Sequence, residues 1–415
     1  MKLQELKIPY GIHCVFPAAI LATCLVILAV VRLHPGCTQL LPLVASSEET
    51  DDGWRTDSGN QSSCDIFKGE WVPDPGARKP YTPETCPVIH GHYDCMRYGR
   101  PDTGLVQWRW RPVDCDLLPR FLAAMRGRSV AFVGDSLARN QMHSLVCLLA
   151  SAEQPTPWTR NASSHVYRYN HHDFTVALFW SPFLVRAVEE ADPDGPARSG
   201  AGLWRLHLDK PDPGWTAHVA GFDVVVISAS SWFYRPAMLY EADTLVGCSG
   251  CLRPNVTDLT VRYSLRMAFR TALRRAAAVG DGRRGRTVVV RTFSPAHYEN
   301  GTGDGGATAD CVRTRPLRRG EKWEVNALEK EMYAIQREEF SAAEEEASRE
   351  GKKRKGVRMM LLDATEAMAQ RPDAHPGRYR LWQPDRFNVS RDCLHWCLPG
   401  AMDACNDMLQ HMLLR

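Results

Sequence analysis

The sequence predicts an α/β protein in which helices cover both faces of a central sheet. Short apolar runs typical of buried strands recur along the chain, and helical stretches separate them. A glycine-led turn joins the first of these strands directly to a helix. Strand, turn and helix repeated in this order build a three-layer α/β/α sandwich.

The individual elements follow from the local pattern of the chain. A buried-strand signal at 129–133 runs into the turn Gly134-Asp-Ser136, and residues 137–149 have helical character. Later elements of the same kinds complete the expected core: strands at 224–227, 287–290 and 357–362, and helices at 259–278, 322–349 and 401–414. No internal repeat interrupts this series.

The first 63 residues are expected to lie outside the sandwich. Residues 14–31 carry no charge and predict one transmembrane helix, so residues 1–35 are interpreted as a cytoplasmic tail and signal anchor. A cleaved signal peptide is the alternative, but this apolar run exceeds the usual h-region of roughly 7–15 residues and no small-residue cleavage site follows. Residues 36–63 are polar and acidic, which predicts a flexible lumenal stem.

Cysteine usage predicts a disulfide-bonded lumenal protein. Residues 64–116 are rich in cysteine, proline and glycine without a helical period, and predict an irregular subdomain before the main domain at 117–415. Such a cysteine density suits an oxidising compartment. The disulfide candidates are Cys64, Cys86, Cys95, Cys115, Cys147, Cys248, Cys251, Cys311, Cys393 and Cys397. Cys405 is expected to be unpaired.

The glycosylation sequons and the net charge of the chain limit its compartment and the classes of partner it can bind. Four glycosylation sequons, at Asn161, Asn255, Asn300 and Asn388, agree with a lumenal placement. The formal net charge of +3 is small for 415 residues, and no basic stripe carries interleaved aromatics. We therefore expect no nucleic-acid partner.

Ser136 is the candidate nucleophile. It follows a buried strand on a glycine-led turn into a helix, which raises its hydroxyl at the carboxyl edge of the sheet and places its N–H at a helix start. The simpler alternative is a serine that only caps the helix. The tripeptide by itself does not decide between them.

Asp392 and His395 are the candidate relay. They lie three residues apart just before a predicted helix, where one local turn can hold a carboxylate beside an imidazole. Alternatively Cys393, His395 and Cys397 could bind a metal, or His395 could be structural; partner ligands at zinc spacing are missing, so no metal is expected. The CxxC at 248–251 is interpreted as a structural disulfide.

Longer motifs around these residues carry a family resemblance. Segments 133–141 and 392–400 resemble the trichome birefringence-like family of plant polysaccharide O-acetyltransferases, and the resemblance extends to 64–72, 108–110, 232–236 and 371–377. It implies a single-pass type II Golgi membrane protein with a GDSL/SGNH-type esterase-like fold. It also implies that Ser136, Asp392 and His395 form a catalytic triad.

The resemblance also indicates an acceptor. Segments 208–210, 255–257, 293–301 and 311–316 look most like the xyloglucan-acetylating branch, with mannan-acetylating relatives next. One departure stands out, because this chain has Ser228-Ala-Ser-Ser231 where the family usually has glycine and a polar residue before Trp-Phe. If that loop lines the oxyanion site, its geometry here differs.

The predicted reaction is acetyl transfer to a polysaccharide hydroxyl through an acetyl-serine. No bound cofactor is expected, but an acetyl donor such as acetyl-CoA is required. Gly134, Asp135 and Asn140 are the tentative oxyanion or substrate residues beside the Ser136 N–H. The alternatives are a polysaccharide acetyl esterase, which uses the same triad, and a catalytically impaired polysaccharide-binding scaffold.

Overall fold

The computed structural model describes residues 65–76, 80–113, 121–160, 163–190, 202–251, 253–278, 285–299, 310–351, 356–380 and 391–415. Residues Gln61–Arg415 form one compact unit. The predicted membrane span and stem lie outside the described residues. Within those residues no helix has the length and apolar character needed to cross a bilayer.

A seven-stranded sheet forms the centre of the fold, in the order β13-β12-β9-β3-β6-β5-β4. The first five strands of this order run parallel to one another, and β5 and β4 complete one edge antiparallel. The strands are β3 (Ser129–Gly134), β4 (Thr156–Arg160), β5 (Ser164–Tyr169), β6 (Phe174–Trp180), β9 (Val224–Ser228), β12 (Arg286–Arg291) and β13 (Val357–Leu362). The strands predicted at 129–133, 224–227, 287–290 and 357–362 are thereby confirmed.

The order of the parallel strands determines where a site can form. The chain goes from β3 to the edge strand β4, returns through β5 to β6 beside β3, then crosses to the other side of β3 and continues through β9, β12 and β13. The direction of winding therefore reverses between β3 and β9. In open α/β sheets, ligands bind outside the carboxyl ends of the strands at such a reversal.

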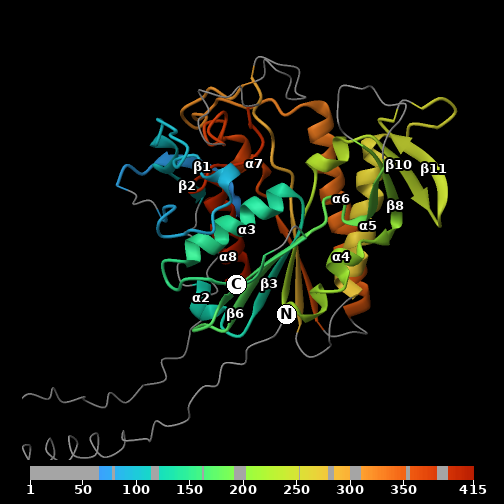
Figure 1. The fold of residues 1–415 in the computed structure, drawn as a ribbon, viewed down its shortest axis with the longest axis horizontal. Coiled ribbons are helices and arrows are strands. Elements are labelled where there is room, and N and C mark those ends of the chain that lie inside the picture. Colours follow the sequence, from blue (N-terminus) through green and yellow to red (C-terminus); the bar gives the residue numbers. More distant parts are fainter. Residues whose placement is uncertain are drawn as a thin grey trace, which may run out of the picture. The chain divides into compact units, whose positions relative to one another are not determined.

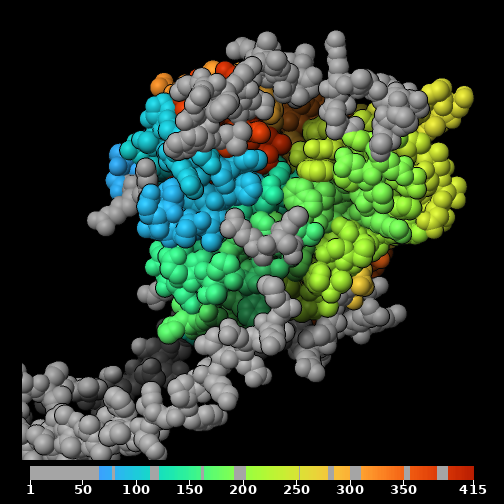
Figure 2. All heavy atoms as spheres, in the orientation of Figure 1, coloured from blue at the N-terminus to red at the C-terminus, as the bar shows by residue number. Residues whose placement is uncertain are grey.

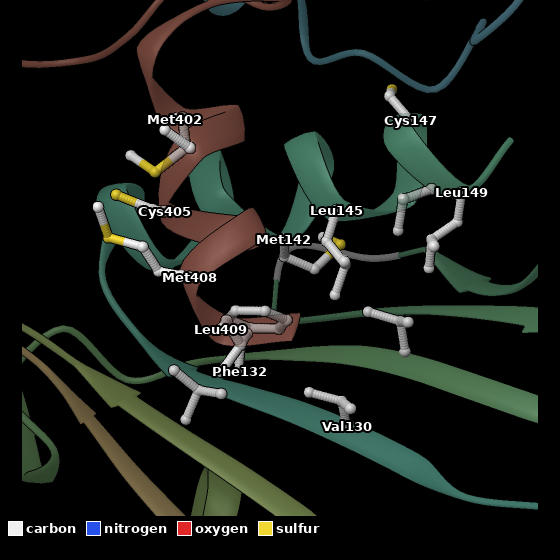
Figure 3. Close-up of a cluster of buried hydrophobic side chains, with 14 of the residues drawn as sticks. Val130, Phe132, Met142, Leu145, Cys147, Leu149, Met402, Cys405, Met408 and Leu409 are labelled. Carbon is white, nitrogen blue, oxygen red and sulfur yellow. The ribbon is translucent and has the colours of Figure 1, made fainter. Parts of the chain in front are cut away.

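Helices cover both faces of this sheet, as predicted (Figure 1). On one face α3 (Ser136–Leu149) and α8 (Ala401–Leu414) pack over Val130 and Phe132, and Figure 3 shows their leucine and methionine side chains meeting above β3. On the other face α5 (Thr260–Ala278) and α6 (Ala327–Gly351) pack over the alternate residues of the same strand, Ala131 and Val133. A strand buried on both faces reads as a continuous apolar run.

The predicted helices are confirmed with shifted ends. The helix expected from residue 322 begins at Ala327, because Asn326 caps it: Asn326 Oδ1 accepts from the Glu329 N–H (2.8 Å), and Glu329 accepts from the Asn326 N–H (3.3 Å). Three short helices were not predicted: α2 (Phe121–Ala124), α4 (Pro213–Thr216) and α7 (Thr365–Ala369). Each is too short to show a helical period in sequence.

A second sheet of four strands, in the order β11-β10-β8-β7, was not predicted. Its strands are β7 (Val185–Glu190), β8 (Leu203–Pro211), β10 (Ala237–Glu241) and β11 (Thr244–Ser249). They carry alternating polar and apolar residues with several charges, so no buried-strand run marks them. The sheet packs against α5.

The N-terminal segment is more regular than expected and packs directly on the sandwich. Strands β1 (Asp65–Pro73) and β2 (Trp108–Val113) pair antiparallel, which corrects the prediction of a wholly irregular subdomain. Two disulfides, Cys86–Cys147 and Cys95–Cys397, join the intervening residues to α3 and to the segment before α8. In Figure 2 these N-terminal residues (blue) lie against the rest of the compact unit.

Candidate functional site

Ser136 lies at the carboxyl edge of β3, where the sheet order reverses. Gly134 ends the strand with φ 150°, and a Cβ on it would lie 1.7 Å from the Ser228 carbonyl oxygen. Only glycine therefore lets the strand end this close to β9. Ser136 then begins α3, so its N–H belongs to the first turn and has no intrahelical acceptor.

Asp135, and not Ser136, caps this helix. Its Oδ1 accepts from the Leu137 N–H (2.9 Å), and its Oδ2 accepts from the Ser230 N–H (3.1 Å). A buried carboxylate that accepts these bonds cannot donate one to an oxyanion. The contacts replace the tentative oxyanion role of Asp135 with a structural one, in which it fixes the helix start to the loop after β9.

Ser136, His395 and Asp392 are brought together in one hydrogen-bonded chain. The Ser136 Oγ lies 2.7 Å from His395 Nε2, and His395 Nδ1 lies 2.8 Å from Asp392 Oδ2. Ser136 is 8% exposed and the His395 side chain 19%, so the group opens to solvent only at the serine and imidazole. This arrangement allows the imidazole to take the hydroxyl proton while the carboxylate holds its tautomer.

Asp392 is held in its charged form. Burial would raise its pKa, but the charge and hydrogen bonds of His395, together with Arg380 at 3.8 Å, outweigh burial and hold the pKa well below its usual range. Its Oδ1 also accepts from the backbone N–H groups of Leu394 (3.2 Å) and His395 (3.0 Å). The carboxylate thus shapes its own loop as well as orienting the imidazole.

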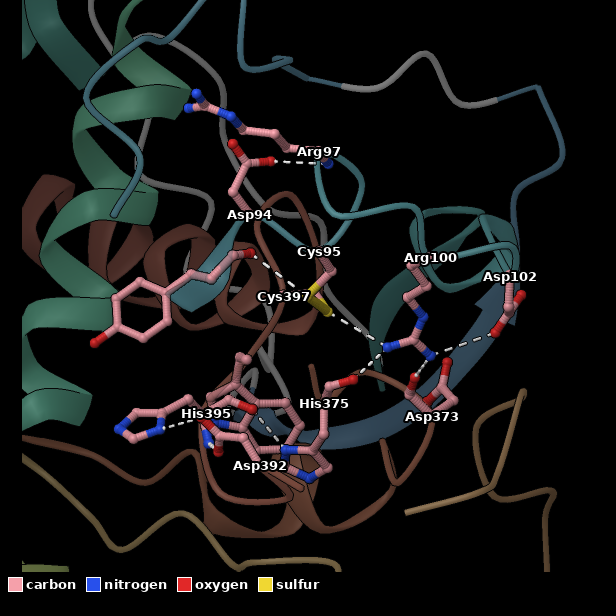
Figure 4. The surroundings of a disulfide bond; sticks show 12 residues. Asp94, Cys95, Arg97, Arg100, Asp102, Asp373, His375, Asp392, His395 and Cys397 are labelled. Carbon is pink, nitrogen blue, oxygen red and sulfur yellow. Dashed lines mark hydrogen bonds and ion pairs between the residues drawn. A yellow bond between two sulfur atoms is a disulfide. The ribbon is translucent and has the colours of Figure 1, made fainter. Parts of the chain in front are cut away.

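The loop that carries His395 has no regular secondary structure and is fixed from outside. The Cys311–Cys393 and Cys95–Cys397 disulfides tie it down on both sides of the histidine. Asp392 and Gly377 exchange two backbone hydrogen bonds of 2.9 Å. Figure 4 shows Arg100 beside the Cys95–Cys397 disulfide; it donates to the Asp373 carbonyl (2.6 Å) and to the His375 carbonyl.

Asn140 has a positioning contact in place of the predicted oxyanion contact. Its side chain is fully buried and grips the Trp396 backbone twice, donating from Nδ2 to the carbonyl (3.1 Å) and accepting at Oδ1 from the N–H (2.8 Å). Its amide therefore points at the loop that carries His395, called the catalytic loop below. Asn140 sets the distance between α3 and the residue that follows His395.

Tyr93 places the N-terminal segment inside the site, which sequence reasoning missed. Its hydroxyl donates to the Ser136 carbonyl (2.9 Å) and accepts from Arg139 Nε (3.4 Å), and its ring lies 5.6 Å from the His395 ring. Burial raises the pKa of Tyr93 to about 12, so the hydroxyl stays protonated. No spacing in the sequence relates Tyr93 to Ser136.

Two buried histidines support His395 from behind. His297 Nδ1 lies 2.6 Å from His375 Nε2, His375 Nδ1 lies 2.7 Å from the His395 carbonyl, and His297 Nε2 lies 3.0 Å from the Ala369 carbonyl. Burial lowers the pKa of His297 to about 4 and that of His375 further, so both rings are neutral at neutral pH.

Neutral rings carry only two protons for these three contacts. A carbonyl oxygen can only accept, so His375 Nδ1–H donates to the His395 carbonyl, and the second proton serves one of the two contacts of His297. His375 thus holds the backbone of His395, whose ring contacts Ser136. It belongs to the 371–377 motif, which the sequence marked without revealing this contact.

The unusual loop after β9 does not use the left-handed backbone that favours glycine. Ser230 has φ −163° and ψ −65°, so its φ is negative. Ser228 Oγ accepts two bonds from the buried Arg291 guanidinium, 2.6 and 3.0 Å long, and Arg291 also donates to Ser294. The loop is therefore fixed from β12 as well as by Asp135.

The remaining predicted residues have simple outcomes. The Cys248–Cys251 disulfide is present, and Cys405 is free and buried. Because Cys393 and Cys397 are both in disulfides, neither offers a thiolate for the alternative metal site. Asn255 is exposed on a turn, while Asn161, Asn300, Asn388, Cys64 and Cys115 lie outside the described residues.

The fold and this arrangement define an acyl-esterase-like α/β protein. Residues 118–412 match the GDSL/SGNH-like acyl-esterase family found in Pmr5 and Cas1p, and residues 62–116 match the PMR5 N-terminal domain. The chain belongs to the trichome birefringence-like family, as its motifs predict.

Its relatives are similar over most of their length. Trichome birefringence-like protein 19 of Arabidopsis thaliana is 44% identical, over 86% of this chain and 82% of the relative. Xyloglucan O-acetyltransferase 4 of Populus trichocarpa is 39% identical over 86% and 82%, and xyloglucan O-acetyltransferase 2 of Arabidopsis thaliana 37% identical over 84% and 82%.

Proposed function

We propose that this protein is a polysaccharide O-acetyltransferase that transfers acetyl groups to hydroxyls of xyloglucan, with mannan as the next acceptor. The observation that carries the proposal is the hydrogen-bonded chain from Ser136 through His395 to Asp392 at 2.7 and 2.8 Å. The names of its xyloglucan O-acetyltransferase relatives support the acceptor.

The first half-reaction forms an acetyl-enzyme. His395 Nε2 takes the proton of Ser136, whose oxygen attacks the acetyl carbonyl of the donor, and Asp392 stabilises the imidazolium. His395 then gives the proton to the leaving group of the donor. The donor, for example acetyl-CoA, is a substrate, and no bound cofactor takes part in this scheme.

The negative oxygen of the tetrahedral intermediate needs a preorganised donor. The Ser136 N–H, in the first turn of α3, serves this role in the proposal, since the Ser230 N–H already donates to Asp135 and the Asn140 amide is bound to the Trp396 backbone. The positive end of the helix dipole adds to the same stabilisation.

In the second half-reaction a sugar hydroxyl attacks the acetyl-enzyme with His395 as the base. Transfer must exclude water, because the same triad hydrolyses the acetyl-enzyme when water arrives first. Trp180 and Trp232 flank the reversal point of the sheet, with ring centroids 5.4 Å apart, and each has an arginine over its ring, Arg139 and Arg235. These aromatic groups suit an acceptor sugar that must be held against Ser136.

We further propose that the protein works as a single-pass type II Golgi membrane protein with its catalytic domain in the lumen. The uncharged run 14–31, the four disulfides of the described residues and the exposed Asn255 sequon support this placement. Fusing the chain to a fluorescent protein and testing its protease sensitivity in sealed vesicles checks it; a cytosolic catalytic domain would contradict it.

One assay tests the reaction. The purified chain is incubated with an acetyl donor and, separately, with xyloglucan, glucomannan and xylan oligosaccharides, and the products are read by mass. We expect acetylated xyloglucan oligosaccharide, with the rate lowered about 10³- to 10⁶-fold by Ser136→Ala. Free acetate without acetylated sugar would indicate an esterase, and sugar binding without either product would indicate a scaffold.

A further inference from the structure

A second groove lies away from the catalytic chain. It has a volume of about 1170 Å³ and runs between the β1–β2 hairpin, residues 316–323 and α7. None of Ser136, Asp392 or His395 lines it. Its function is therefore separate from the chemistry at the serine.

The groove has aromatic walls. Trp71, Trp108 and Trp323 line it together with three prolines. Trp71 is fixed, since its indole N–H donates to the Ala367 carbonyl (2.8 Å), whereas Trp108 and Trp323 keep part of their surface exposed. A pyranose ring has an apolar C–H face and a rim of hydroxyls, and exposed indole rings offer the flat apolar surface that such a face packs against.

The charges of the groove suit a neutral, hydroxyl-rich ligand. Four cationic side chains and three carboxylates line it, so its net field is weak. Several are already paired: Arg111 with Glu70, and Glu321 with Arg315 from outside the groove. A site for phosphate or nucleic acid would show a single dominant sign. Planar guanidinium and carboxylate groups also form directed hydrogen bonds to hydroxyls.

The wall opposite the hairpin is preformed. Arg315 binds Glu321 through two bonds of 2.8 and 2.9 Å, the Arg318 N–H donates to Glu321 (2.8 Å), and the Leu317 N–H donates to the Gln370 carbonyl of the turn after α7 (2.9 Å). A ligand entering this groove therefore does not need to order the wall first.

The groove is structurally continuous with the catalytic loop. The Trp323 ring lies 4.6 Å from His297, which reaches the His395 carbonyl through His375. The segment that carries the wall is also tied to the catalytic loop by the Cys311–Cys393 disulfide. A polymeric acceptor can occupy the groove and the site at Ser136 at the same time. A short oligosaccharide can bind at Ser136 without reaching the groove.

We propose that this groove is a second glycan subsite, which binds a stretch of the neutral acceptor polysaccharide remote from the residue that is acetylated. The inference rests on the proposed function for the identity of the acceptor. Its occupant is a neutral β-linked glycan chain, which packs on Trp108 and Trp323 and hydrogen-bonds to the charged rim.

Chain-length dependence tests the subsite. In the full chain, Trp108→Ala is expected to raise KM for polymeric xyloglucan about tenfold. The kcat, the KM for a single-repeat xyloglucan oligosaccharide and the hydrolysis of a small acetyl ester should change less than about twofold. Equal losses for polymer and oligosaccharide, or no loss for either, would overturn the proposal.

Two further arms keep the result interpretable. Arg319→Ala changes an exposed rim residue and should weaken polymer binding a few-fold even if a tryptophan variant fails to fold. Calorimetric binding of polymeric xyloglucan to Ser136→Ala protein needs no turnover, so retained binding that Trp323→Ala abolishes supports the subsite even where acetyl transfer fails. Tighter binding of polygalacturonate than of xyloglucan would contradict a neutral ligand.

Discussion

Ser136 and His395 meet at 2.7 Å, but the chain positions them in different ways. Ser136 is placed by the two residues before it at the end of β3, where Gly134 allows the close approach and Asp135 caps the helix. His395 lies in a loop that two disulfides, Asn140 and His375 hold from distant parts of the chain. Local geometry builds one half of the site and long-range contacts build the other.

The difference explains why the N-terminal segment packs against the site of Ser136 and His395. Tyr93, Cys95 and Arg100 all come from that segment. Tyr93 donates to the Ser136 carbonyl, and Cys95 and Arg100 contact Cys397 in the loop that carries His395. A loop without its own hydrogen-bond ladder needs such external partners to keep one conformation. The N-terminal segment thus stabilises the loop that carries His395, which has no regular secondary structure of its own.

The largest effect is expected where the loop meets the imidazole. Asp392→Asn removes the charge that stabilises the imidazolium and selects its tautomer, so kcat should fall about 10⁴-fold with little change in KM. The matched control is Arg380→Gln, which removes only the 3.8 Å contact to Asp392 and should cost less than about tenfold. Similar losses in both variants would contradict the assigned role of Asp392.

The strand end that places Ser136 should be disrupted by a side chain at Gly134. Gly134→Ala places a Cβ 1.7 Å from the Ser228 carbonyl, so the strand end must move, and the free energy of unfolding should fall by about 4 kcal/mol. Gly99→Ala is the control, because Gly99 also has positive φ (80°) but open space around it, and it should cost about 1 kcal/mol. Denaturant unfolding measures the free energy of unfolding of both variants. Equal losses would contradict the role assigned to the close approach between Gly134 and Ser228.

Acid should destabilise the half of the site that long-range contacts hold, the loop of His395. The folded-state pKa of His297 is about 4, below the ordinary 6.5, so its contribution to stability is complete above pH 6.5 and is lost as the pH falls towards 4. His297 should account for about 3 kcal/mol of the unfolding free energy lost over this range, and His375, whose pKa burial lowers further, adds to the loss. His297→Asn should make the pH dependence shallower, and an unchanged slope in that variant would show that other groups are responsible.

His375 tests the backbone bond directly. His375→Phe keeps a ring beside Trp396 but loses the donor to the His395 carbonyl, so kcat should fall about 10- to 100-fold. His375→Asn places an amide N–H near the lost Nδ1–H and should restore most of the rate. A Phe variant with lower stability and full kcat would mean that the ring only fills space.

Cys405 should have the smallest effect. It is buried in α8 away from the catalytic chain, and burial raises the pKa of its thiol to about 12. Cys405→Ala should leave kcat within about twofold and cost about 1 kcal/mol of stability. The folded protein should also resist thiol reagents at this position, as peptide mapping after alkylation would show; rapid labelling would contradict its burial.

The fold and the site differ in how far the sequence predicts them. The parallel strands and covering helices were predictable because each carries its own apolar pattern, and Ser136, Asp392 and His395 stand in recognisable local motifs. The four-stranded sheet was not, because its strands are partly polar and carry no continuous apolar run. Tyr93, His297 and His375 were also missed, since their roles depend on contacts across 43 to 78 positions of the chain or on backbone carbonyls.

The central claim is that Ser136 carries the acetyl group between donor and sugar. To measure this directly, the protein is mixed with a small acetyl ester, the reaction is quenched rapidly, and the peptides are analysed by mass spectrometry. We expect the mass of one acetyl group on the peptide that contains Ser136, its loss when xyloglucan oligosaccharide is added, and its absence in Ser136→Ala protein. Acetyl transfer that proceeds without acetyl on Ser136, or an acetyl group on another residue that turns over with the sugar, would contradict the account.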